Sequence, residues 1–198
     1  MPALVLIRHA PTDWSAHGRL QGRSDQPLSD VGREMARMWA LPKAIVAGAA
    51  GVTSPLVRAR HTACAMGLTA RIEPALIEMD WGDWEGDRLD RLRAADPPGM
   101  AVLERQGLDF RPPGGESYRD VADRLAGWVR AQAAHTRPTV GITHKGVITV
   151  ALALATGWDM TTVRPAKLLP ACWHRFEIDP AGRLSVDRLN QPFEDVLT

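Results

Sequence analysis

Two short, mostly apolar runs, each followed by a histidine, constrain the fold of this 198-residue chain more than any other feature of its sequence. Residues 4–7 precede Arg8 and His9, and residues 139–143 precede His144. A continuous apolar run bounded by polar or turn residues is typical of a strand that is buried on both faces of a parallel sheet. The sequence therefore predicts an α/β fold in which both histidines follow the carboxyl ends of buried strands.

These strand ends are also candidate ligand sites, because ligands of open α/β sheets bind at the edge formed by the carboxyl ends of the strands. The Arg8 guanidinium offers a fixed fork of donors to phosphate oxygens. A histidine can act as nucleophile or proton carrier. Each motif alone has an ordinary alternative: Arg8 and His9 could end a surface strand by chance, and His144 could be a core or turn histidine.

Composition and charge narrow the classes of function. The net charge is +1, with acidic and basic residues interspersed, which argues against a nucleic-acid or anionic-membrane partner. Cys64 and Cys172 form neither a disulfide framework nor a metal-ligand pattern, so a reduced, intracellular protein is the simplest interpretation. The N-terminus lacks the features of a signal peptide, and the longest apolar run, residues 147–155, is too short to span a bilayer. We expect a cytoplasmic protein.

A second arginine is expected near the same edge of the sheet. Ser54 and Pro55 predict a helix that starts with a capping serine and a proline in the first turn. Arg58 then lies close to a helix N-terminus, where anions are stabilised. Arg60 is better explained as a solvated surface residue.

The remaining elements follow from periodicity and turn signals. Further helices are predicted at residues 29–41, 87–95, 98–106, 117–135 and 147–156, and further strands at 51–54, 71–73, 172–178 and 184–189. In the first of these helices, the apolar stripe of Val31, Met35, Met38 and Trp39 predicts core positions. The segment 87–112 carries few large apolar residues and is expected to form a peripheral cap.

Four carboxylates and two tryptophans share the glycine-punctuated segment 76–86. Tryptophans can desolvate a neighbouring carboxyl group and keep it protonated, as a general acid requires. A solvated acidic loop anchored by one tryptophan explains the same residues, and the segment alone leaves both interpretations open.

Five motifs, in this order, resemble those of the histidine phosphatase superfamily, which has the phosphoglycerate-mutase-like fold. They are RHAPT with GRLQGR at residues 8–12 and 18–23, SPLVRARHTA at 54–63, EMDWGDWEG at 78–86, PGGES at 113–117 and THKGVI at 143–148. The resemblance spans roughly residues 5–156 and is to the phosphatase branch. It implies one domain over residues 1–198, built as a three-layer α/β/α sandwich with a mostly parallel central sheet and a small helical cap inserted at about 87–112.

The resemblance also implies a mechanism. His9 would attack phosphorus and carry the phosphoryl group as phosphohistidine. Arg8, Arg58 and His144 would neutralise the equatorial oxygens. Glu78 would protonate the leaving oxygen and then take a proton from the attacking water. No metal or other cofactor is expected, because these groups already supply the positive charge.

The chain departs from the family pattern at four positions. Ala10 stands where glycine is usual, Ser15 where asparagine is frequent, Lys145 where a second glycine is usual, and Thr149 where arginine is often found. We expect a weaker phosphate contact from Ser15, and Lys145 either adds positive charge at the pocket mouth or points to solvent. These departures concern substrate choice rather than the chemistry.

The resemblance therefore predicts a phosphomonoesterase that acts on a small phosphorylated metabolite, as a monomer or homodimer. The predicted substrate contacts are Arg8, Trp14, Ser15, Gln21, Arg58, Trp81, His144 and Lys145. Tryptophans near the pocket favour a leaving group with a flat or apolar body, so alpha-ribazole phosphate is one candidate, and sugar phosphates and phosphoglycerate are others.

Two other functions fit the same scaffold. Phosphoglycerate mutases of this group carry an extra basic segment after the proton-donor loop, whereas residues 87–110 here are short and mixed in charge. A non-catalytic phosphate-binding module would have lost core residues, and none is lost here. A metal hydrolase is disfavoured, because neither histidine has a ligand at metal-binding spacing.

Overall fold

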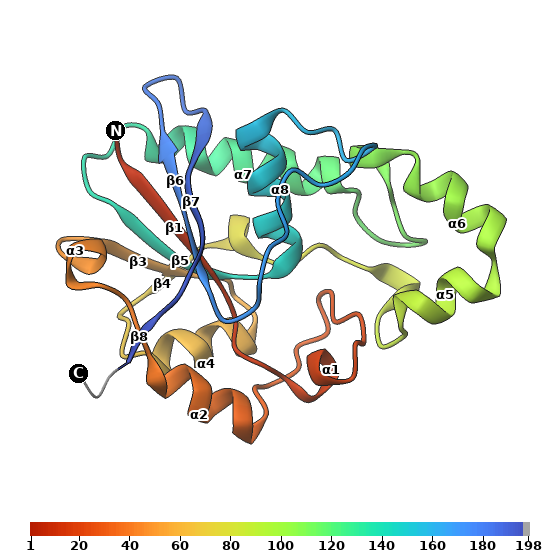
Figure 1. The fold of residues 1–198 in the computed structure, drawn as a ribbon, viewed down its shortest axis with the longest axis horizontal. Helices are drawn as coiled ribbons and strands as arrows, with labels where there is room; N and C mark the ends of the chain where they lie inside the picture. Colours follow the sequence, from red (N-terminus) through yellow and green to blue (C-terminus); the bar gives the residue numbers. More distant parts are fainter. Residues whose placement is uncertain (196–198) are drawn as a thin grey trace.

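A six-stranded sheet forms the centre of the computed structural model, which describes residues 1–195 (Figure 1). The strand order is β4-β3-β5-β1-β6-β7. The pairs among β4, β3, β5 and β1 are parallel, whereas β6 and β7 pair antiparallel with their neighbours. The strands are β1 (Ala3–Arg8), β3 (Ala50–Thr53), β4 (Arg71–Ile72), β5 (Thr139–Thr143), β6 (Trp173–Ile178) and β7 (Leu184–Gln191). The predicted mostly parallel sheet is confirmed.

Helices cover both faces of this sheet, α2 and α4 on one face and α7 and α8 on the other. The helices are α1 (Asp13–Ala16), α2 (Asp30–Met38), α3 (Lys43–Val46), α4 (Val57–Ala65), α5 (Leu89–Ala95), α6 (Pro97–Glu104), α7 (Tyr118–Gln132) and α8 (Lys145–Thr156). The shorter elements are η1 (Pro74–Leu76), η2 (Gly82–Trp84), η3 (Gly107–Asp109) and the paired strands β2 (Trp39–Ala40) and β8 (Glu194–Asp195). The predicted three-layer α/β/α arrangement is confirmed.

The opening strand explains why both faces need cover. Successive side chains of a strand point to opposite faces of the sheet. Leu4 and Leu6 of β1 belong to the apolar cluster under α7 and α8, whereas Val5 and Ile7 belong to the cluster under α2 and α4. All four side chains are buried. An unbroken apolar run therefore specifies a strand packed between two helical layers, which fixes the position of the residues that follow it.

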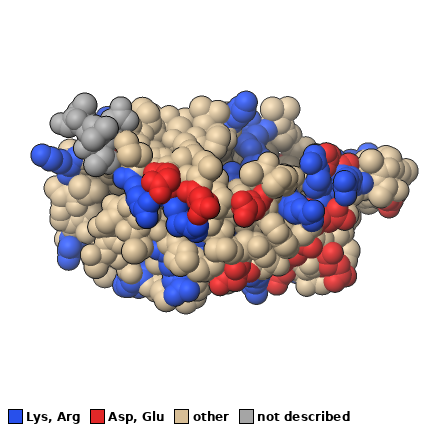
Figure 2. Space-filling view, turned by 90° about the horizontal axis from the view of Figure 1, so that it is seen from below, with Lys and Arg blue, Asp and Glu red and all other residues tan. Residues whose placement is uncertain are grey.

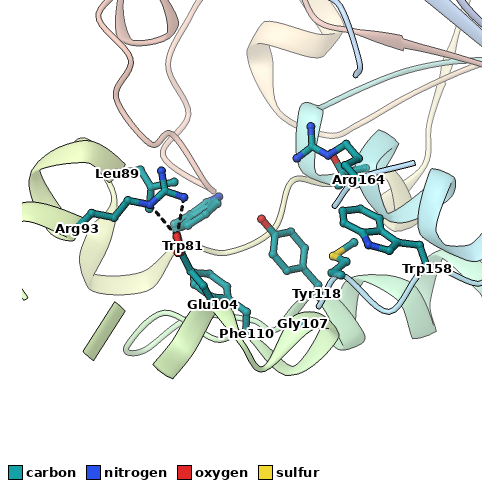
Figure 3. Close-up of a pocket in the computed structure, with 11 residues that line it drawn as sticks. Trp81, Leu89, Arg93, Glu104, Gly107, Phe110, Tyr118, Trp158 and Arg164 are labelled. Carbon is teal, nitrogen blue, oxygen red and sulfur yellow. Dashed lines mark hydrogen bonds and ion pairs between the residues drawn. The ribbon is translucent and has the colours of Figure 1, made fainter. Parts of the chain in front are cut away.

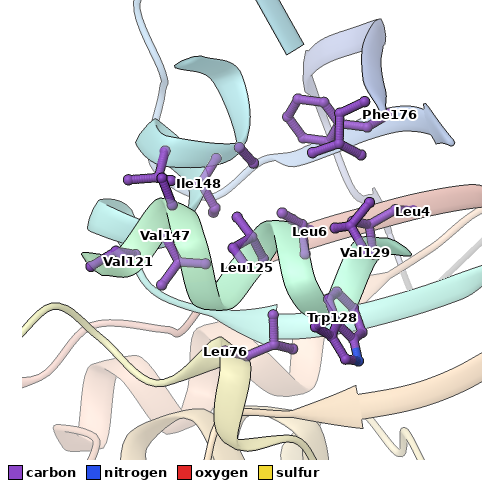
Figure 4. Packing of buried hydrophobic residues seen from close by; sticks show 14 of the residues in the cluster. Leu4, Leu6, Leu76, Val121, Leu125, Trp128, Val129, Val147, Ile148 and Phe176 are labelled. Atoms are coloured by element: carbon purple, nitrogen blue, oxygen red, sulfur yellow. The ribbon is translucent and has the colours of Figure 1, made fainter. Parts of the chain in front are cut away.

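Helix α7 illustrates how local sequence and packing agree. Its N-cap is Ser117, whose hydroxyl accepts a hydrogen bond from the Asp120 N–H at 3.1 Å in a capping box. Val121, Leu125 and Val129 follow at four-residue spacing, all buried against the sheet (Figure 4). This apolar stripe packs α7 onto the same face of the sheet as α8, the helix that follows β5.

Helices α5 and α6 project beyond the sheet at one end of the molecule (Figure 1). Two exposed arginines of this region are in ion pairs, Arg88–Asp90 at 2.6 Å and Arg93–Glu104 at 2.6 Å. On the face seen in Figure 2, Lys and Arg side chains are interspersed with Asp and Glu. Within residues 1–195, no helix combines the length and the apolar character needed to cross a bilayer.

Two predictions about the first helices are wrong. The predicted helix at 29–41 begins after Ser29, which caps it as expected, but it ends at Met38. Val31 is 67% exposed and Met38 is 45% exposed, so neither belongs to the core. The buried residues of α2 are Gly32 and Ala36, because the helix packs too closely for large side chains. A Cβ on Gly32 would lie 1.9 Å from the Pro11 carbonyl oxygen.

The predicted capping role of Ser54 is also wrong. Helix α4 begins at Val57, and its N-cap residue Leu56 makes no side-chain cap. The Val57 N–H instead donates to the Asp25 carboxylate at 2.6 Å, from a loop far away in the sequence. This leaves the Ser54 hydroxyl free for another partner. Residues 18–25, predicted to be a loop, form one, and the short helix α1 precedes them.

Candidate active site

The carboxyl ends of β1, β3 and β5 bring the predicted site residues together. The His9 N–H donates to the Thr143 carbonyl at 2.8 Å, which joins the ends of β1 and β5. The Ser54 N–H donates to the Ile142 carbonyl at 2.9 Å, which joins the ends of β3 and β5. The rings of His9 and His144 are 5.2 Å apart between centroids, and both side chains are buried. Two residues separated by 135 positions therefore face each other across one small space.

The backbone fixes the orientation of the His9 ring. Its Nδ1 lies 2.7 Å from the Ala10 carbonyl oxygen. A carbonyl only accepts hydrogen bonds, so we assign the proton of the neutral ring to Nδ1, which leaves a lone pair on Nε2. Burial, together with the Arg8 and Arg58 charges, lowers the pKa of His9 well below its ordinary value. His9 is thus held as a neutral imidazole with Nε2 available for attack.

Ser54 orients the His144 ring so that the nitrogen without a partner carries a proton, whereas that of His9 carries a lone pair. The Nε2 of His144 lies 2.7 Å from the Ser54 hydroxyl oxygen, which also accepts a hydrogen bond from the Leu56 N–H at 3.3 Å. We therefore assign the hydroxyl proton to the bond with Nε2, so that Nδ1 of the neutral ring carries a proton. Burial, followed by the charge of Arg58, lowers the pKa of His144 well below its ordinary value. Nδ1 is buried and has no hydrogen-bond partner in the described part of the chain.

Arg58 is fully buried and its guanidinium is only partly satisfied. One terminal nitrogen donates to the Ser24 carbonyl at 2.8 Å and the other to the Gly22 carbonyl at 2.7 Å. The buried Nε has no partner among the residues that the structure describes. Arg58 therefore has Nε free for a ligand, while each terminal nitrogen uses one of its two N–H groups to hold the loop at residues 22–24.

Glu85 holds the same loop from the other side. Its carboxylate accepts hydrogen bonds from the Arg23 N–H at 2.6 Å, the Ser24 N–H at 2.8 Å and the Ser24 hydroxyl at 2.6 Å. Gly22 has φ +48°, and a Cβ there would lie 1.8 Å from a Glu85 oxygen. Only glycine fits this position. The absence of a side chain lets Glu85 approach the loop and hold it where its carbonyl groups contact Arg58.

Glu78 lies against the N-terminus of α8. It is 9% exposed, and its carboxylate accepts hydrogen bonds from the Met79 N–H at 3.0 Å and the Gly146 N–H at 3.3 Å. A Cβ on Gly146 would lie 2.4 Å from a Glu78 oxygen, so glycine is required for this approach. The indoles of Trp81 and Trp84 both pack around Phe110, with ring centroids 6.0 Å from it. The contacts of the Glu78 carboxylate are thus backbone N–H groups, and the predicted desolvation by tryptophans stays a prediction.

The other predicted substrate contacts differ in what they offer. The Gln21 carbonyl oxygen accepts from the Thr12 hydroxyl at 2.9 Å, which leaves the amide NH₂ for a ligand. The Ser15 hydroxyl is engaged in a capping box with Thr12. The Trp14 ring lies against Gly86, and Lys145 is exposed. The neighbouring charges of Arg8 and Arg164, after desolvation, lower the pKa of Lys145.

A cavity of about 480 Å³ gives access to Arg8 and His9. Ser15 also lines it, together with apolar side chains such as Val31 and Met35 of α2. The exposure of Val31, unexpected for a core position, is explained by this cavity. The nucleophile candidate is therefore buried but reachable.

A sequence model of the histidine phosphatase superfamily, branch 1, matches residues 4–192. The chain belongs to the histidine phosphatase superfamily. A glucosyl-3-phosphoglycerate phosphatase of Mycolicibacterium vanbaalenii is 36% identical over 167 residues, which cover 78% of this chain and 74% of that protein. A probable phosphoglycerate mutase of Cronobacter sakazakii is 33% identical over 135 residues, which cover 66% of this chain and 63% of that protein. The native structure of a mycobacterial glucosyl-3-phosphoglycerate phosphatase has a TM-score of 0.77 at 28% identity, covering 96% of this chain and 99% of that one. The predicted family and fold class are confirmed.

Sequence reasoning missed two residues that organise the site of this histidine phosphatase. Ser54 was expected to cap a helix, and it instead orients His144. Glu85 was only one of four carboxylates in an acidic segment, and it holds the loop that Arg58 contacts. The pairing of Glu85 with a glycine 63 positions earlier is a tertiary contact, so no local signal indicates it.

Buried neutral imidazoles make the fold of this histidine phosphatase sensitive to acid. Burial lowers the pKa of His174 to about 4 and those of His9 and His144 well below their ordinary value of 6.5. Below about pH 6.5 the unfolded chain binds protons that the folded protein does not, so stability is lost as the pH falls. The slope is at most about 1.4 kcal/mol per imidazole per pH unit. We expect the urea midpoint to fall more between about pH 6.5 and 5 than between about pH 8 and 6.5.

The control for this pH dependence is a matched pair of histidine variants. His61→Gln replaces an exposed histidine of α4 and should keep the full pH dependence. His174→Gln retains an acceptor for the Asn190 N–H and should remove about a third of the dependence. A urea midpoint that does not change down to about pH 5 would contradict the burial of neutral imidazoles.

Proposed function

We propose that this chain, a phosphomonoesterase of the histidine phosphatase superfamily, hydrolyses a small phosphorylated metabolite through a phosphohistidine at His9. The observation that carries the proposal is that two buried nitrogens near His9, Arg58 Nε and His144 Nδ1, which is assigned above as a donor, have no partner among the described residues. An unsatisfied buried donor costs about 1–3 kcal/mol, so it indicates a missing acceptor. A phosphoryl group beside His9 supplies that acceptor.

The proposed reaction has two steps. In the first, His9 Nε2 forms a bond to phosphorus as the bond to the leaving oxygen breaks, and Glu78 in its acid form gives that oxygen a proton. In the second, water attacks the phosphohistidine, Glu78 takes a proton from the water, and phosphate leaves as the P–N bond breaks. Throughout, Arg8, Arg58 Nε and His144 Nδ1 neutralise the charge on the equatorial oxygens. We propose that the free amide of Gln21 adds a further donor.

Relatives suggest which metabolites to test first. The name of the relative from Mycolicibacterium vanbaalenii makes glucosyl-3-phosphoglycerate the leading candidate. Alpha-ribazole phosphate and simple sugar phosphates remain candidates on the earlier argument from aromatic residues near the pocket. We keep the cytoplasmic location and the monomeric or homodimeric state as predictions.

A phosphoglycerate mutase activity is the second candidate, because one relative is named a probable phosphoglycerate mutase. Mutases of this group carry an extra basic segment after the proton-donor loop, whereas residues 87–110 here are short and mixed in charge. Here the cap arginines Arg88 and Arg93 are engaged by Asp90 and Glu104. We therefore favour hydrolysis.

The test is a screen of a panel of phosphorylated metabolites for release of inorganic phosphate, with a chelator present and no bisphosphate primer. We expect one or a few panel members to release phosphate stoichiometrically with loss of the monoester. Isomerisation that depends on a bisphosphate primer would support the mutase instead. Binding of phosphate esters without any turnover would support a non-catalytic module.

A further inference from the structure

A second cavity, of about 200 Å³, plays no part in the mechanism above (Figure 3). Arg164, which lines it, and Arg8 of the proposed phosphate site both lie close enough to Lys145 for their charges to act on it. The cavity is enclosed by residues of the cap, by the start of α7 and by the segment that follows α8. Thr149, which lines it, bonds to the Lys145 carbonyl at 2.8 Å one helical turn from the start of α8. Trp81, which also lines it, follows Glu78 by three residues.

The position of this cavity suits a leaving group. In phosphoryl transfer, the attacking and leaving oxygens or nitrogens lie roughly in line through phosphorus. His9 lines the larger cavity described above, whereas Tyr118 of the smaller cavity lies close enough to Glu78, the proposed acid, to interact with its charge. The leaving group must depart on the side of the acid, so the smaller cavity is where its body would lie.

Four aromatic residues line this cavity. Trp81, Phe110 and Tyr118 form a continuous row, with ring centroids 6.0 Å apart for the first pair and 5.7 Å for the second. Trp158 lies across from them (Figure 3). Flat, rigid walls of this kind pack against the apolar face of a small ring, and the volume limits that ring to about the size of one sugar.

Of the three charged residues that line the cavity, two form an ion pair with each other and the third has no ion-pair partner among the described residues. Arg93 and Glu104 form an ion pair at 2.6 Å. Arg164 lies over the Trp158 ring, 5.9 Å from its centroid, and has no ion-pair partner within residues 1–195. The Tyr118 hydroxyl points into the same space (Figure 3), and burial raises its pKa to about 12, so it remains a donor at neutral pH. The cavity therefore offers one unmatched positive charge and one hydroxyl donor.

We propose that this cavity is the leaving-group site and that Arg164, with Tyr118, selects phosphomonoesters whose leaving group carries a carboxylate on or beside a sugar-sized ring. This inference rests on the proposed function, because it assumes that a phosphomonoester binds at His9. A guanidinium held over an indole presents its N–H edge to an acceptor, and a carboxylate matches that edge best. The ring occupies the aromatic row, and its hydroxyl groups reach the Arg93–Glu104 pair.

The experiment compares Arg164→Gln with the parent enzyme on substrates that differ in charge. The substrates are glucosyl-3-phosphoglycerate and 3-phosphoglycerate, which carry a carboxylate, and glycerol 3-phosphate and p-nitrophenyl phosphate, which do not. We expect kcat/KM for the first two to fall by about 10- to 100-fold, mostly through KM. For the other two, kcat/KM should stay within about twofold. Arg105→Gln, an exposed arginine at the end of α6, is the matched control and should change none of the four.

The outcomes separate this inference from the proposed function. Equal losses on all four substrates, or no loss on the carboxylate pair, would overturn the selection by Arg164 while leaving the phosphatase activity in place. A parent enzyme that hydrolyses only the two substrates without a carboxylate would overturn it in the same way. A parent enzyme that hydrolyses no phosphomonoester would overturn the proposed function and this inference together.

Discussion

Replacing His9 with alanine is expected to lower the turnover of every phosphomonoester by about 10⁴-fold or more, with the fold unchanged. The loss is large because the proposed reaction needs a P–N bond, and Nε2 of His9 is the atom whose lone pair the Nδ1–Ala10 contact leaves free. Removing one donor from around the phosphate would weaken one interaction, whereas removing the nucleophile removes the covalent route. The measurement is kcat on p-nitrophenyl phosphate and on the best metabolite, with circular dichroism to check the fold.

Two controls make this result specific to His9. His61→Ala removes an exposed histidine on α4 and should leave kcat unchanged. In the parent enzyme, an alkaline quench during turnover should trap one phosphoryl group, which mass spectrometry should locate on the peptide that contains His9. Near-normal turnover of His9→Ala, or a phosphoryl group on another residue, would remove His9 from the role of nucleophile.

The main features of the fold were predictable from sequence because they depend on local patterns. The run at residues 4–7 is apolar at every position, and only a strand packed between two layers buries all of it. The turn that ends at Ser117 and the apolar stripe behind it, at three- and four-residue spacing, predicted α7 in the same way. Since parallel strands end at one edge, these patterns also placed His9 and His144 near each other.

The errors occur where packing distance overrides hydropathy. Of the predicted core stripe, Met35 and Trp39 do pack into the core, whereas Val31 and Met38 do not. Helix α2 lies so close to Pro11 that no side chain fits at Gly32. The apolar side chain of Val31 instead lines the cavity that leads to His9. Hydrophobic periodicity identifies large residues, and it fails when a helix is docked through small ones.

Part of the site was not predictable because its interactions join distant segments. A serine followed by proline is a helix-start signal, and nothing local indicates that Asp25 would supply the cap of α4 and leave Ser54 for His144. The same holds for Glu85, whose carboxylate meets Gly22 across 63 positions. Sequence indicated which residues could do the chemistry, and the tertiary structure determines which atoms of those residues remain available.

Which nitrogen of each histidine remains available depends on the charge of the ring and on its one hydrogen bond. Burial and the guanidiniums of Arg8 and Arg58 keep both imidazoles neutral, and each ring is then oriented by one hydrogen bond. His9 presents a lone pair and His144 presents a proton, although the two residue types are identical. Leaving two buried donors unsatisfied costs a few kcal/mol, roughly 1–3 for each, and the proposed phosphoryl group would offset that cost.

Glu78→Gln is expected to affect substrates according to their leaving groups. An alkyl alcohol is a poor leaving group that needs a proton as the P–O bond breaks, so its release should slow by about 10²- to 10⁴-fold. The p-nitrophenolate ion leaves without protonation, and formation of phosphohistidine from p-nitrophenyl phosphate should slow by less than about tenfold. Glutamine keeps the size of the side chain but only one acceptor oxygen, so one of the Met79 and Gly146 N–H groups loses its partner, and the resulting loss should be common to both substrates. The measurement is the single-turnover rate on glycerol 3-phosphate and on p-nitrophenyl phosphate.

The neighbouring carboxylates provide the controls, because the same segment offers two other candidates for the acid. Asp83 is exposed, and Asp83→Asn should leave both rates close to those of the parent enzyme. Asp80 accepts from the Gly82 N–H at 2.8 Å and lies 3.5 Å from the Arg23 guanidinium. Asp80→Asn should therefore affect both substrates alike, through the shape of the loop. Equal losses on the two substrates for Glu78→Gln, with a selective loss for Asp80→Asn or Asp83→Asn, would assign proton transfer to that aspartate. A selective loss for Glu78→Gln alone would place the acid where its carboxylate meets the start of α8, between the phosphate site and the aromatic cavity.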